Sequence, residues 1–371
     1  MNPNQMDGDT AFQQICFKTY IALARNVADF PFVCPNTPSS KHFAMAEKWS
    51  QLLQRYFRFE DVTADEQLRT QGFRFHRLTP DGMRSPAYRL LRLDCVLQEQ
   101  QHTIWCELMT ENHFTFSVTI NTPDLVKQTR VLEFIADEVA KHVKFAYDAQ
   151  WGYLTAEPIR TGSGLFIRSW THLLGLTLAD TMPQALNAAE VKGVFGEKDT
   201  MYESASSEFY HFSNRFSINL TPTQIVRDFK AFLVRLAKEE HRARLRLAYD
   251  QPAILFDLLS RARFLFQQVY LPSPEETLYA LSLYWTACSV GALEPLDAPQ
   301  YQFATCFDWM ADECCESHLL PAIREQDVQA LPAAFLPFWK NRDPEMLRAL
   351  WLRPLGEAPF SPTFLNRINH K

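Results

Sequence analysis

One group of residues in this chain could ligate a metal ion. The vicinal pair Cys314 and Cys315 lies beside Asp312, Glu313 and His318, and thiolate, carboxylate and imidazole groups are all metal ligands. The chain has no CxxC pair, however, and the stretch has helical periodicity, which favours free buried thiols. We therefore predict no metal site, no zinc ribbon and no disulfide framework.

A second group consists of acids and arginines at predicted strand ends and turns. Glu111 lies in the short polar segment TENH between two strand-like runs, so we expect its carboxylate at one end of a sheet. Gly162 and Gly164 bracket Ser163 in a tight turn that requires positive φ, and basic side chains flank this turn. A carboxylate in a hairpin turn is usually only solvated, and a lone GxG is not specific, so these residues need further support.

The elements that must position these residues follow from hydrophobic periodicity. Alternating or β-rich runs predict strands at 89–98, 103–109, 114–120, 151–155 and 208–220, and three- to four-residue spacing predicts a helix over 128–148. Thr221-Pro222-Thr223-Gln224 predicts the start of a long helix to about Leu247, with an N-cap, a proline at the first helical position and a capping-box glutamine. His172 and His211 fall in apolar stretches and are predicted core histidines.

Composition excludes several classes of function. The chain has 371 residues, of which 47% are hydrophobic, and its net charge of -6 disfavours nucleic acid and anionic membranes as partners. No run of apolar residues is long enough for a membrane helix, and the N-terminus lacks a secretory pattern, so we expect a cytoplasmic protein. The 11 glycines are few for this length and argue against folds that need several glycine-rich loops.

The predicted secondary structure changes near residue 250. Strand signals vanish after Pro252, and helical periodicity dominates 253–295 and 305–352, with prolines between the segments. We therefore predict two domains, at 1–249 and 250–371, of which the second is all-α.

Several ordered motifs in the first domain carry a resemblance to a known family. The segments WGYLTAEPIRTGSGLF, VKGVFGE and FYHFSN resemble the WGYLTxCPTNxGTGLR, VRGxYGE and FxxSN motifs of the phosphagen (ATP:guanido) kinases, in the same order. Upstream, YIALARNVADFPF resembles RIRLARNxxxxPFP, and TENH resembles the NEEDH turn. The resemblance covers about residues 15–295 and is strongest to the bacterial protein-arginine kinase branch.

This resemblance implies an α+β fold, in which an antiparallel sheet is flanked by helices, and transfer of the γ-phosphoryl group of ATP to a guanidinium nitrogen. In such a reaction the protein aligns phosphates and orients the nucleophile. The family uses a cradle of arginines for the phosphates, because their planar forks fit phosphate oxygens, and a pair of carboxylates for the guanidinium.

The two sets differ in this chain. Four of the five cradle arginines are replaced, by Tyr20, Ala22, Thr115 and Phe166, and the fifth becomes Lys192, which keeps the charge but not the fork. Both carboxylate positions remain, as Glu111 and Glu197. In addition, Glu157 replaces the cysteine that precedes the motif's proline and adds negative charge near a site that should attract ATP.

The missing arginines decide the expected chemistry. Each charge-assisted hydrogen bond to phosphate contributes about 1.5–3 kcal/mol, so four absent ones remove roughly 6–12 kcal/mol before any correction for non-additivity. A rewired site could compensate through Arg160, Arg168 and Arg25, with Trp170 stacking on the adenine.

The C-terminal domain has a further, weaker similarity. In the protein-arginine kinase branch this domain mediates dimer contacts and binds phosphoarginine through a pattern like RDxxRAxxIR. The segment NRDPEMLRALWLR at 341–353 offers Arg342, Asp343 and Arg348 for that role if two residues are inserted. A match without a gap instead puts Pro344-Glu345 at the Arg-Asp positions, so the pocket would lack its arginine. The alternative is a proline-started amphipathic helix with solvated arginines.

Three hypotheses follow. The first is a pseudokinase that needs no cofactor and binds a protein partner through Glu111 and Glu197. An arginine- or phosphoarginine-bearing protein and a second copy of this chain, in a homodimer, are the candidate partners. The second is an active Mg-ATP-dependent protein-arginine kinase in which Lys192, Arg160 or Arg168 holds phosphate. The third is a structural scaffold in which the carboxylates have no role.

Overall fold

A computed structural model describes residues 8–33, 39–62, 87–97, 99–199, 208–294, 296 and 312–369, without the side chains of residues 11 and 312–314. Its centre is an eight-stranded sheet with the order β2-β3-β4-β5-β1-β8-β10-β9, in which every neighbouring pair is antiparallel. The strands are β1 (Cys16–Arg25), β2 (Glu60–Asp61), β3 (Arg89–Leu97), β4 (Gln100–Leu108), β5 (Phe114–Ile120), β8 (Leu165–His172), β9 (Val194–Lys198) and β10 (Phe209–Asn214). A separate ribbon consists of β6 (Tyr147–Asp148) and β7 (Gly152–Tyr153). The predicted antiparallel sheet is confirmed.

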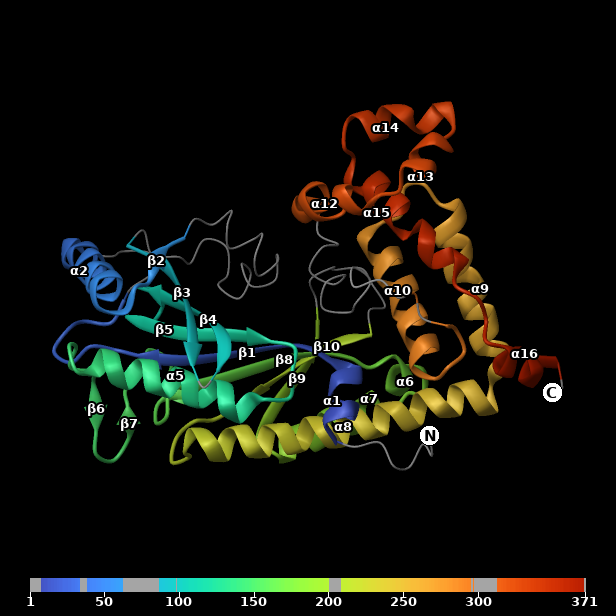
Figure 1. Cartoon of the computed structure of the whole chain (residues 1–371). Coiled ribbons are helices and arrows are strands. Elements are labelled where there is room, and N and C mark those ends of the chain that lie inside the picture. The colour runs from blue at the N-terminus through green and yellow to red at the C-terminus, as the bar shows by residue number, and fades with distance from the viewer. Residues whose placement is uncertain are drawn as a thin grey trace.

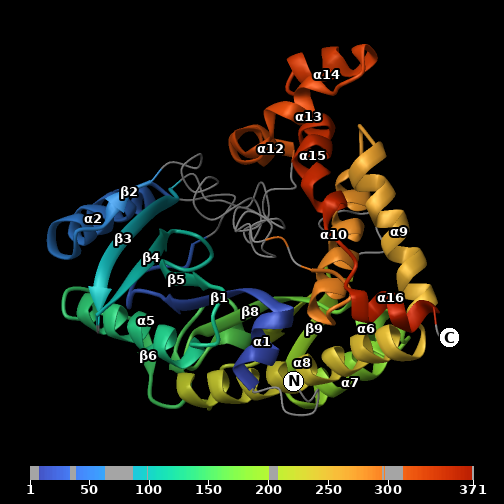
Figure 2. The same ribbon diagram turned by 45° about the vertical axis from the view of Figure 1, so that its right-hand side comes forward.

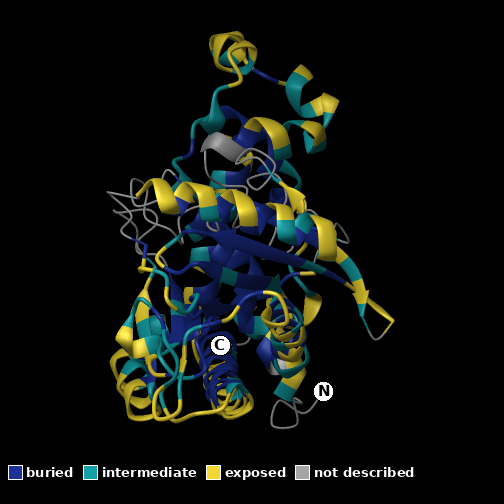
Figure 3. Cartoon of the chain, turned by 90° about the vertical axis from the view of Figure 1, so that its left-hand side faces the viewer, coloured by how far each residue is buried: buried dark blue, intermediate teal, exposed yellow. Residues whose placement is uncertain are grey.

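Helices cover one face of this sheet. Figure 1 shows α5 (Leu125–Ala140) and α8 (Pro222–Asp250) beneath it, with α1 (Gly8–Ile15) against α8, and Figure 2 shows the same arrangement. The first hydrophobic core lies in this layer, where Ile21 and Ile167 of the central strands pack with helix residues such as Leu132. Helix α2 (Ser40–Phe57) lies against β3 and β4, and α6 (Leu174–Leu178) and α7 (Met182–Val191) follow β8. Figure 3 shows the strands as the buried centre, with exposed residues on the outer turns of the helices.

Before residue 250, local signals predicted β3, β4, β5, β7, β10, α5 and α8 but not all of their bounds. The predicted capping box at Thr221 is confirmed. The Thr221 hydroxyl accepts a hydrogen bond from the backbone N–H of Gln224, and the Gln224 side-chain oxygen accepts one from the backbone N–H of Thr221. The predicted helix over 128–148 ends earlier, at Ala140, and Asp148 belongs to β6. The predicted strands at 151–155 and 208–220 shorten to β7 and β10, because the residues beyond each strand turn away to form the loops around Gly162 and Ser217.

The described part of the chain after residue 250 is helical, as predicted. Its helices are α9 (Pro252–Gln268), α10 (Pro274–Ser289), α12 (Asp312–His318), α13 (Glu325–Gln329), α14 (Leu336–Lys340), α15 (Pro344–Leu352) and α16 (Pro362–Asn369). Helix α8 ends at Asp250, and α9 begins two residues later. A second hydrophobic core joins this region to the sheet, because it includes Phe17 and Trp170 as well as Leu281 and Trp351.

A buried polar network crosses the same junction. The carboxylate of Glu240 accepts hydrogen bonds from the backbone N–H groups of Gly175 and Leu176 at the start of α6, and it pairs with Arg244 one turn along α8. The Arg244 guanidinium also donates to His172, at Nδ1 and at the carbonyl, each over 2.9 Å. His172 Nε2 lies 2.5 Å from the Ser282 hydroxyl on α10, so the network ties the sheet to the C-terminal helices. His172 is a satisfied core histidine, as predicted.

Candidate functional site

The face of the sheet opposite α5 and α8 carries the positions where the motif comparison finds replaced arginines. On β1 and β8, Ile21 and Ile167 point into the first core, so their neighbours Tyr20 and Phe166 point to the other face. The strands place Phe166 opposite Ala22. The rings of Tyr20 and Phe166 meet edge to face, with centroids 6.3 Å apart. Their exposed fractions are only 6% and 9%.

These side chains form an apolar floor. Both rings and Ala22 belong to the second hydrophobic core together with Trp170, which is 4% exposed. Burial, followed by the charge of Glu107, raises the pKa of the Tyr20 hydroxyl well above its usual value, so the phenol is neutral. Thr115 pairs with Ala24 at the end of the same face. A neutral floor at these positions provides no cation for phosphate oxygens.

Two arginines lie over this floor. The Cζ atoms of Arg160 and Arg168 lie 4.1 Å and 5.2 Å from the ring centroid of Phe166, within cation–π range. The Nε atom of Arg168 is buried without a hydrogen-bond partner. Burial, then the charge of Arg160, lowers the pKa of Arg168, whereas Glu197 and Asp199 oppose this shift. The sequence placed both arginines beside the GSG turn, and the structure brings them to one ring.

Acidic side chains flank the arginines on one side. Glu157 Oε2 lies 2.6 Å from Nε of Arg160, three residues later on the short 3-10 helix η2 (Pro158–Arg160). The pKa of Glu111 is raised by burial, then by a hydrogen bond with Glu157 and by its charge, and Arg160 partly offsets this shift. Glu111 and Glu157 therefore form a carboxyl pair, in which a nearby positive charge favours the ionised form of Glu111.

A pair of asparagines positions Glu111. The Asn112 amide oxygen accepts hydrogen bonds from the Asn26 side chain over 2.7 Å and from the backbone N–H of Ala156 over 2.9 Å. The Asn26 amide oxygen in turn accepts from the backbone N–H of His113. These bonds hold the turn that carries Glu111 against the loop that carries Glu157. The sequence analysis did not identify Asn26 or Asn112, although their place beside Arg25 and Glu111 in the matched motifs was a usable signal.

Another acidic group lies near Arg168. Glu197 on the edge strand β9 is opposite His211 on β10, and its Oε1 lies 2.6 Å from His211 Nε2. The second histidine nitrogen, Nδ1, lies 3.9 Å from Asp199. Burial, followed by the charge of Arg168, lowers the pKa of His211. His211 is thus largely buried but bonded to a site residue, and Asp199 is a neighbour that the sequence analysis missed.

The other residues considered for nucleotide binding lie elsewhere or have other contacts. Arg25 is 4% exposed, donates to the carbonyls of Ala24 and Ser163, and stacks 3.6 Å from the Tyr153 ring centroid. Burial lowers the pKa of Arg25 to about 10. Gly164 has φ +69°, as predicted, and a Cβ there would lie 2.8 Å from this guanidinium. Lys192 is exposed at the C-cap of α7.

The residues matched to a phosphoarginine pattern have separate roles. Arg342 is exposed, and its Cζ lies 4.7 Å from the Trp339 ring. Asp343 is the N-cap of α15 and accepts hydrogen bonds from the backbone N–H groups of Glu345 and Met346. Arg348 is 1% exposed and donates to Cys315 Sγ over 3.5 Å.

Two sequence expectations concern metals and membranes. Among the described residues, no group of three or more His, Cys, Asp or Glu side chains is placed to hold a metal ion. The side chains of Asp312, Glu313 and Cys314 lie outside the described part. Within the described ranges, no helix has the length and apolar character needed to cross a membrane.

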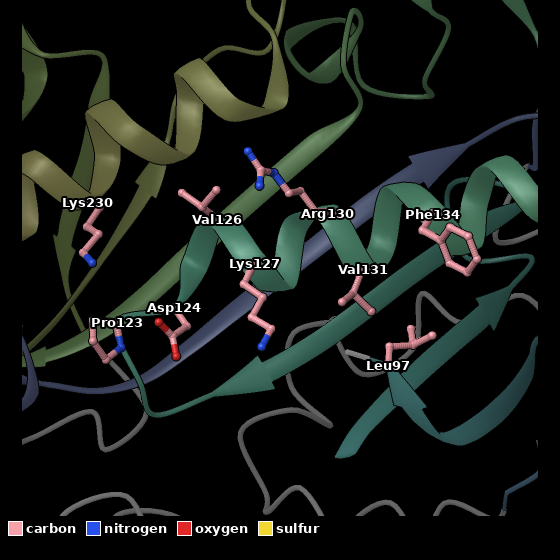
Figure 4. Close-up of a pocket in the computed structure, with 9 residues that line it drawn as sticks. All are labelled: Leu97, Pro123, Asp124, Val126, Lys127, Arg130, Val131, Phe134 and Lys230. Carbon is pink, nitrogen blue, oxygen red and sulfur yellow. The ribbon is translucent and has the colours of Figure 1, made fainter. Parts of the chain in front are cut away.

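A pocket of about 600 Å³ lies on α5 (Figure 4). Its walls are Leu97, Val131 and Phe134, and Lys127 and Arg130 project from α5 beside them. Since α5 covers the opposite face of the sheet, this pocket is separate from the acids and arginines described above.

Known proteins resemble both the sequence and the fold. The sequence model of the ATP:guanido phosphotransferase C-terminal catalytic domain matches residues 48–243. The protein-arginine kinase of Halothermothrix orenii is 23% identical over 296 residues, which cover 77% of this chain and 82% of that protein. The corresponding protein of Moorella thermoacetica is 25% identical over 299 residues, which cover 76% of this chain and 81% of that protein.

A solved structure shows the same fold. The substrate-free duplicated taurocyamine kinase from Schistosoma mansoni aligns with a TM-score of 0.50 at 15% identity. The alignment covers 75% of this chain and 41% of the duplicated kinase, so this chain spans less than half of that protein. The family match covers more than half of the chain, and the matched relatives share most of its length. This chain therefore belongs to the ATP:guanido phosphotransferase family.

Proposed function

We propose that this family member has lost ordinary ATP-dependent phosphoryl transfer and binds a guanidinium group, such as an arginine side chain of a protein partner. The observation that carries the proposal is the buried contact between Tyr20 and Phe166 at two positions where the family motif has arginine. Aromatic rings there cannot donate the charge-assisted hydrogen bonds on which a triphosphate depends.

The acids support the second half of the proposal. Glu111 is held beside Glu157, and burial and the Glu157 carboxylate raise the pKa of Glu111 more than the charge of Arg160 lowers it, so a further positive charge would be favourable here. A planar guanidinium can supply that charge and donate to both carboxylates. Glu197, beside Arg168 and His211, is the second family carboxylate and would orient the same ligand from the other side.

An active kinase with a rearranged nucleotide site is the second candidate, because Arg160 and Arg168 converge on one ring. However, nearby carboxylates of the protein partly neutralise both guanidinium charges. Arg160 pairs with Glu157, and Glu197 and Asp199 act on Arg168. Two acid-flanked arginines are a poorer phosphate site than five arginines.

Calorimetry with two short peptides tests the proposal, one with arginine and the other with lysine at the same position. We expect the arginine peptide to bind better, and Glu111→Gln or Glu197→Gln to weaken it roughly 10- to 100-fold, the equivalent of one charge-assisted hydrogen bond. Glu190→Gln is the control, since Glu190 is an exposed acid that pairs with Arg215. Equal binding by the Glu111/Glu197 double variant would refute guanidinium binding and favour a scaffold.

Nucleotide binding needs a separate measurement. If no nucleotide site remains, Mg-ATP at millimolar concentration should leave the melting temperature unchanged. A nucleotide that did bind, at a concentration far above its Kd, would stabilise the fold by a few kcal/mol and raise the melting temperature. A clear shift together with transfer of phosphate to the arginine peptide, detected by mass spectrometry, would establish the active-kinase alternative.

A further inference from the structure

Arg160 has the geometry of a bound guanidinium ligand. Its Nε lies 2.6 Å from Glu157 Oε2, and its Cζ lies 4.1 Å from the Phe166 ring centroid. A carboxylate and an aromatic face are the two partners that a guanidinium uses in recognition sites. The chain therefore places one of its own arginines where an arginine ligand would find both partners.

Glu111 connects this contact to the proposed binding site. The Glu111 carboxyl lies close enough to Glu157 for that carboxylate to add to burial in raising its pKa, and the charge of Arg160 lowers it. The Asn26–Asn112 pair fixes the two loops relative to each other. A guanidinium arriving at Glu111 must therefore share the Glu157 carboxylate with Arg160 or displace Arg160 from it.

Glu157 and Arg160 both differ from the residues of the family motif, and their charges compensate each other. The family motif reads CPTN where this chain has Glu157-Pro158-Ile159-Arg160, so the acid and its arginine both depart from the motif. An acid alone would leave an additional negative charge beside Glu111, and the arginine three residues later supplies the compensating charge. Exposure of the Arg160 and Glu157 side chains is 29% and 35%, so the pair remains accessible from solvent.

On the premise of the proposed function, we infer that Arg160 is an internal competitor, which occupies the Glu157 carboxylate and the face of Phe166 until an external guanidinium displaces it. The apparent affinity for arginine is then lowered by the fraction of molecules in which Arg160 stays in place. The contact makes binding selective for ligands that offer more than a lone guanidinium, because additional contacts are needed to displace Arg160.

Removal of Arg160 tests this inference. Calorimetry would compare the binding of methylguanidinium and of the arginine peptide to wild type, Arg160→Ala and Arg160→Gln. We expect both ligands to bind Arg160→Ala at least about tenfold more tightly than wild type, the change expected if Arg160 occupies the site nine-tenths of the time. Methylguanidinium at low millimolar concentration should also raise the melting temperature of Arg160→Ala, since it restores the lost cation.

Arg215 provides a matched control. It pairs with Glu190 over 3.0 Å and lies 5.3 Å from the Phe216 ring, the same combination of partners at an exposed position. Arg215→Ala should leave both affinities at the wild-type value. The Arg160→Gln variant keeps most of the side-chain length without the charge, so a gain there as well excludes a simple packing defect.

The outcomes separate the two proposals. Wild-type affinity in Arg160→Ala, with binding still sensitive to Glu111→Gln, would overturn the competitor role and leave guanidinium binding intact. Weaker binding in Arg160→Ala would also overturn it, because Arg160 would then support the ligand. Binding of neither ligand by wild type or Arg160→Ala would refute guanidinium binding itself.

Discussion

The rings of Tyr20 and Phe166, on the neighbouring strands β1 and β8, meet with centroids 6.3 Å apart and an interplanar angle of 63°. The same strands bring Ile21 and Ile167 to the opposite core. The positions matched to the family's cradle arginines thus lie in a hydrophobic layer, while Arg160 reaches the layer from a loop. A charged side chain placed at one of these positions would have to enter this apolar packing.

Restoring one family arginine should therefore destabilise the protein. Phe166→Arg would put a third guanidinium beside Arg160 and Arg168 at a position that is 9% exposed. We expect the free energy of unfolding to fall by about 2–4 kcal/mol, because a charge would be buried among like charges. Urea unfolding of Phe166→Arg, with Phe166→Leu as the apolar control, measures this. A variant as stable as wild type that also gains a Mg-ATP shift would mean that the cradle remains open to phosphate.

The junction between sheet and C-terminal helices depends on an ion pair that solvent does not reach. Arg244 and Glu240 have side-chain exposures of 1% and 0%, and the arginine also bonds His172 and Ser289. Arg244→Met would leave the Glu240 carboxylate buried with less compensation, so we expect a loss of about 3–5 kcal/mol in chemical unfolding. The neighbouring pair Arg242–Glu239 is about half exposed, and Arg242→Met should change stability by only about 0–1 kcal/mol. Similar effects of the two variants would contradict this role for the network.

His113 should make the fold sensitive to acid. Its Nδ1 accepts a hydrogen bond from the backbone N–H of Val27, so Nε2–H donates to the carbonyl of Pro31. Burial lowers the pKa of His113 to about 4. As the pH falls from about 6.5 to 4, the unfolded state takes up the proton first, and the free energy of unfolding decreases by up to about 3 kcal/mol.

Unfolding curves of wild type and His113→Asn across this range test the effect. Asparagine can keep the acceptor for Val27 but does not titrate, so the variant's stability should fall less steeply below pH 6.5. His142 is a suitable control, because His142→Asn changes a histidine that stacks on the Tyr56 ring, which is 56% exposed. Parallel curves for wild type and His113→Asn would show that His113 does not contribute to this slope.

Sequence predicted what depends on local rules. The Thr221 capping box and the positive φ of Gly164 require only a few neighbouring residues, and both are confirmed. The contacts of the candidate site depend on residues far apart in the chain. Arg25 was considered for phosphate, yet its guanidinium bonds Ser163, 138 residues away. The hydrogen bond between the Asn26 and Asn112 side chains joins residues 86 positions apart, and no periodicity or spacing rule indicates such a pair.

The length of strands was overestimated for a related reason. The run 208–220 alternates in character, but the ladder between β10 and β8 ends at Ser213 and Arg168. At Asn214 the side chain, not the backbone, bonds to β8. Its amide oxygen accepts a hydrogen bond from the backbone N–H of Ile167, and its amide nitrogen donates to the carbonyl of Leu165. A polar side chain that replaces ladder bonds in this way ends the strand without any proline or glycine to indicate it.

Glu208 should produce a pH effect of the opposite sign to His113. The residue is 3% exposed at the start of β10, and burial raises its pKa to about 7, with Glu240 adding to the shift and Lys198 opposing it. Between about pH 4.5 and 7 the folded state therefore holds a proton that the unfolded state has lost. The free energy of unfolding must fall as the pH rises through this window, by up to about 3 kcal/mol.

Glu208→Gln isolates this contribution, because glutamine has nearly the same shape and no charge to bury. We expect the variant to resemble wild type near pH 4.5 and to be more stable than wild type at pH 8, with the difference growing between these values. Chemical unfolding at several pH values measures that difference, and Glu239→Gln at an exposed position is the control. A constant difference across the range would mean that Glu208 has the same pKa in both states. A growing difference would identify the Glu208 carboxyl as a source of instability at neutral pH. This carboxyl lies near the C-terminal helices, since its charge, second to burial, contributes to the raised pKa of Tyr279 on α10.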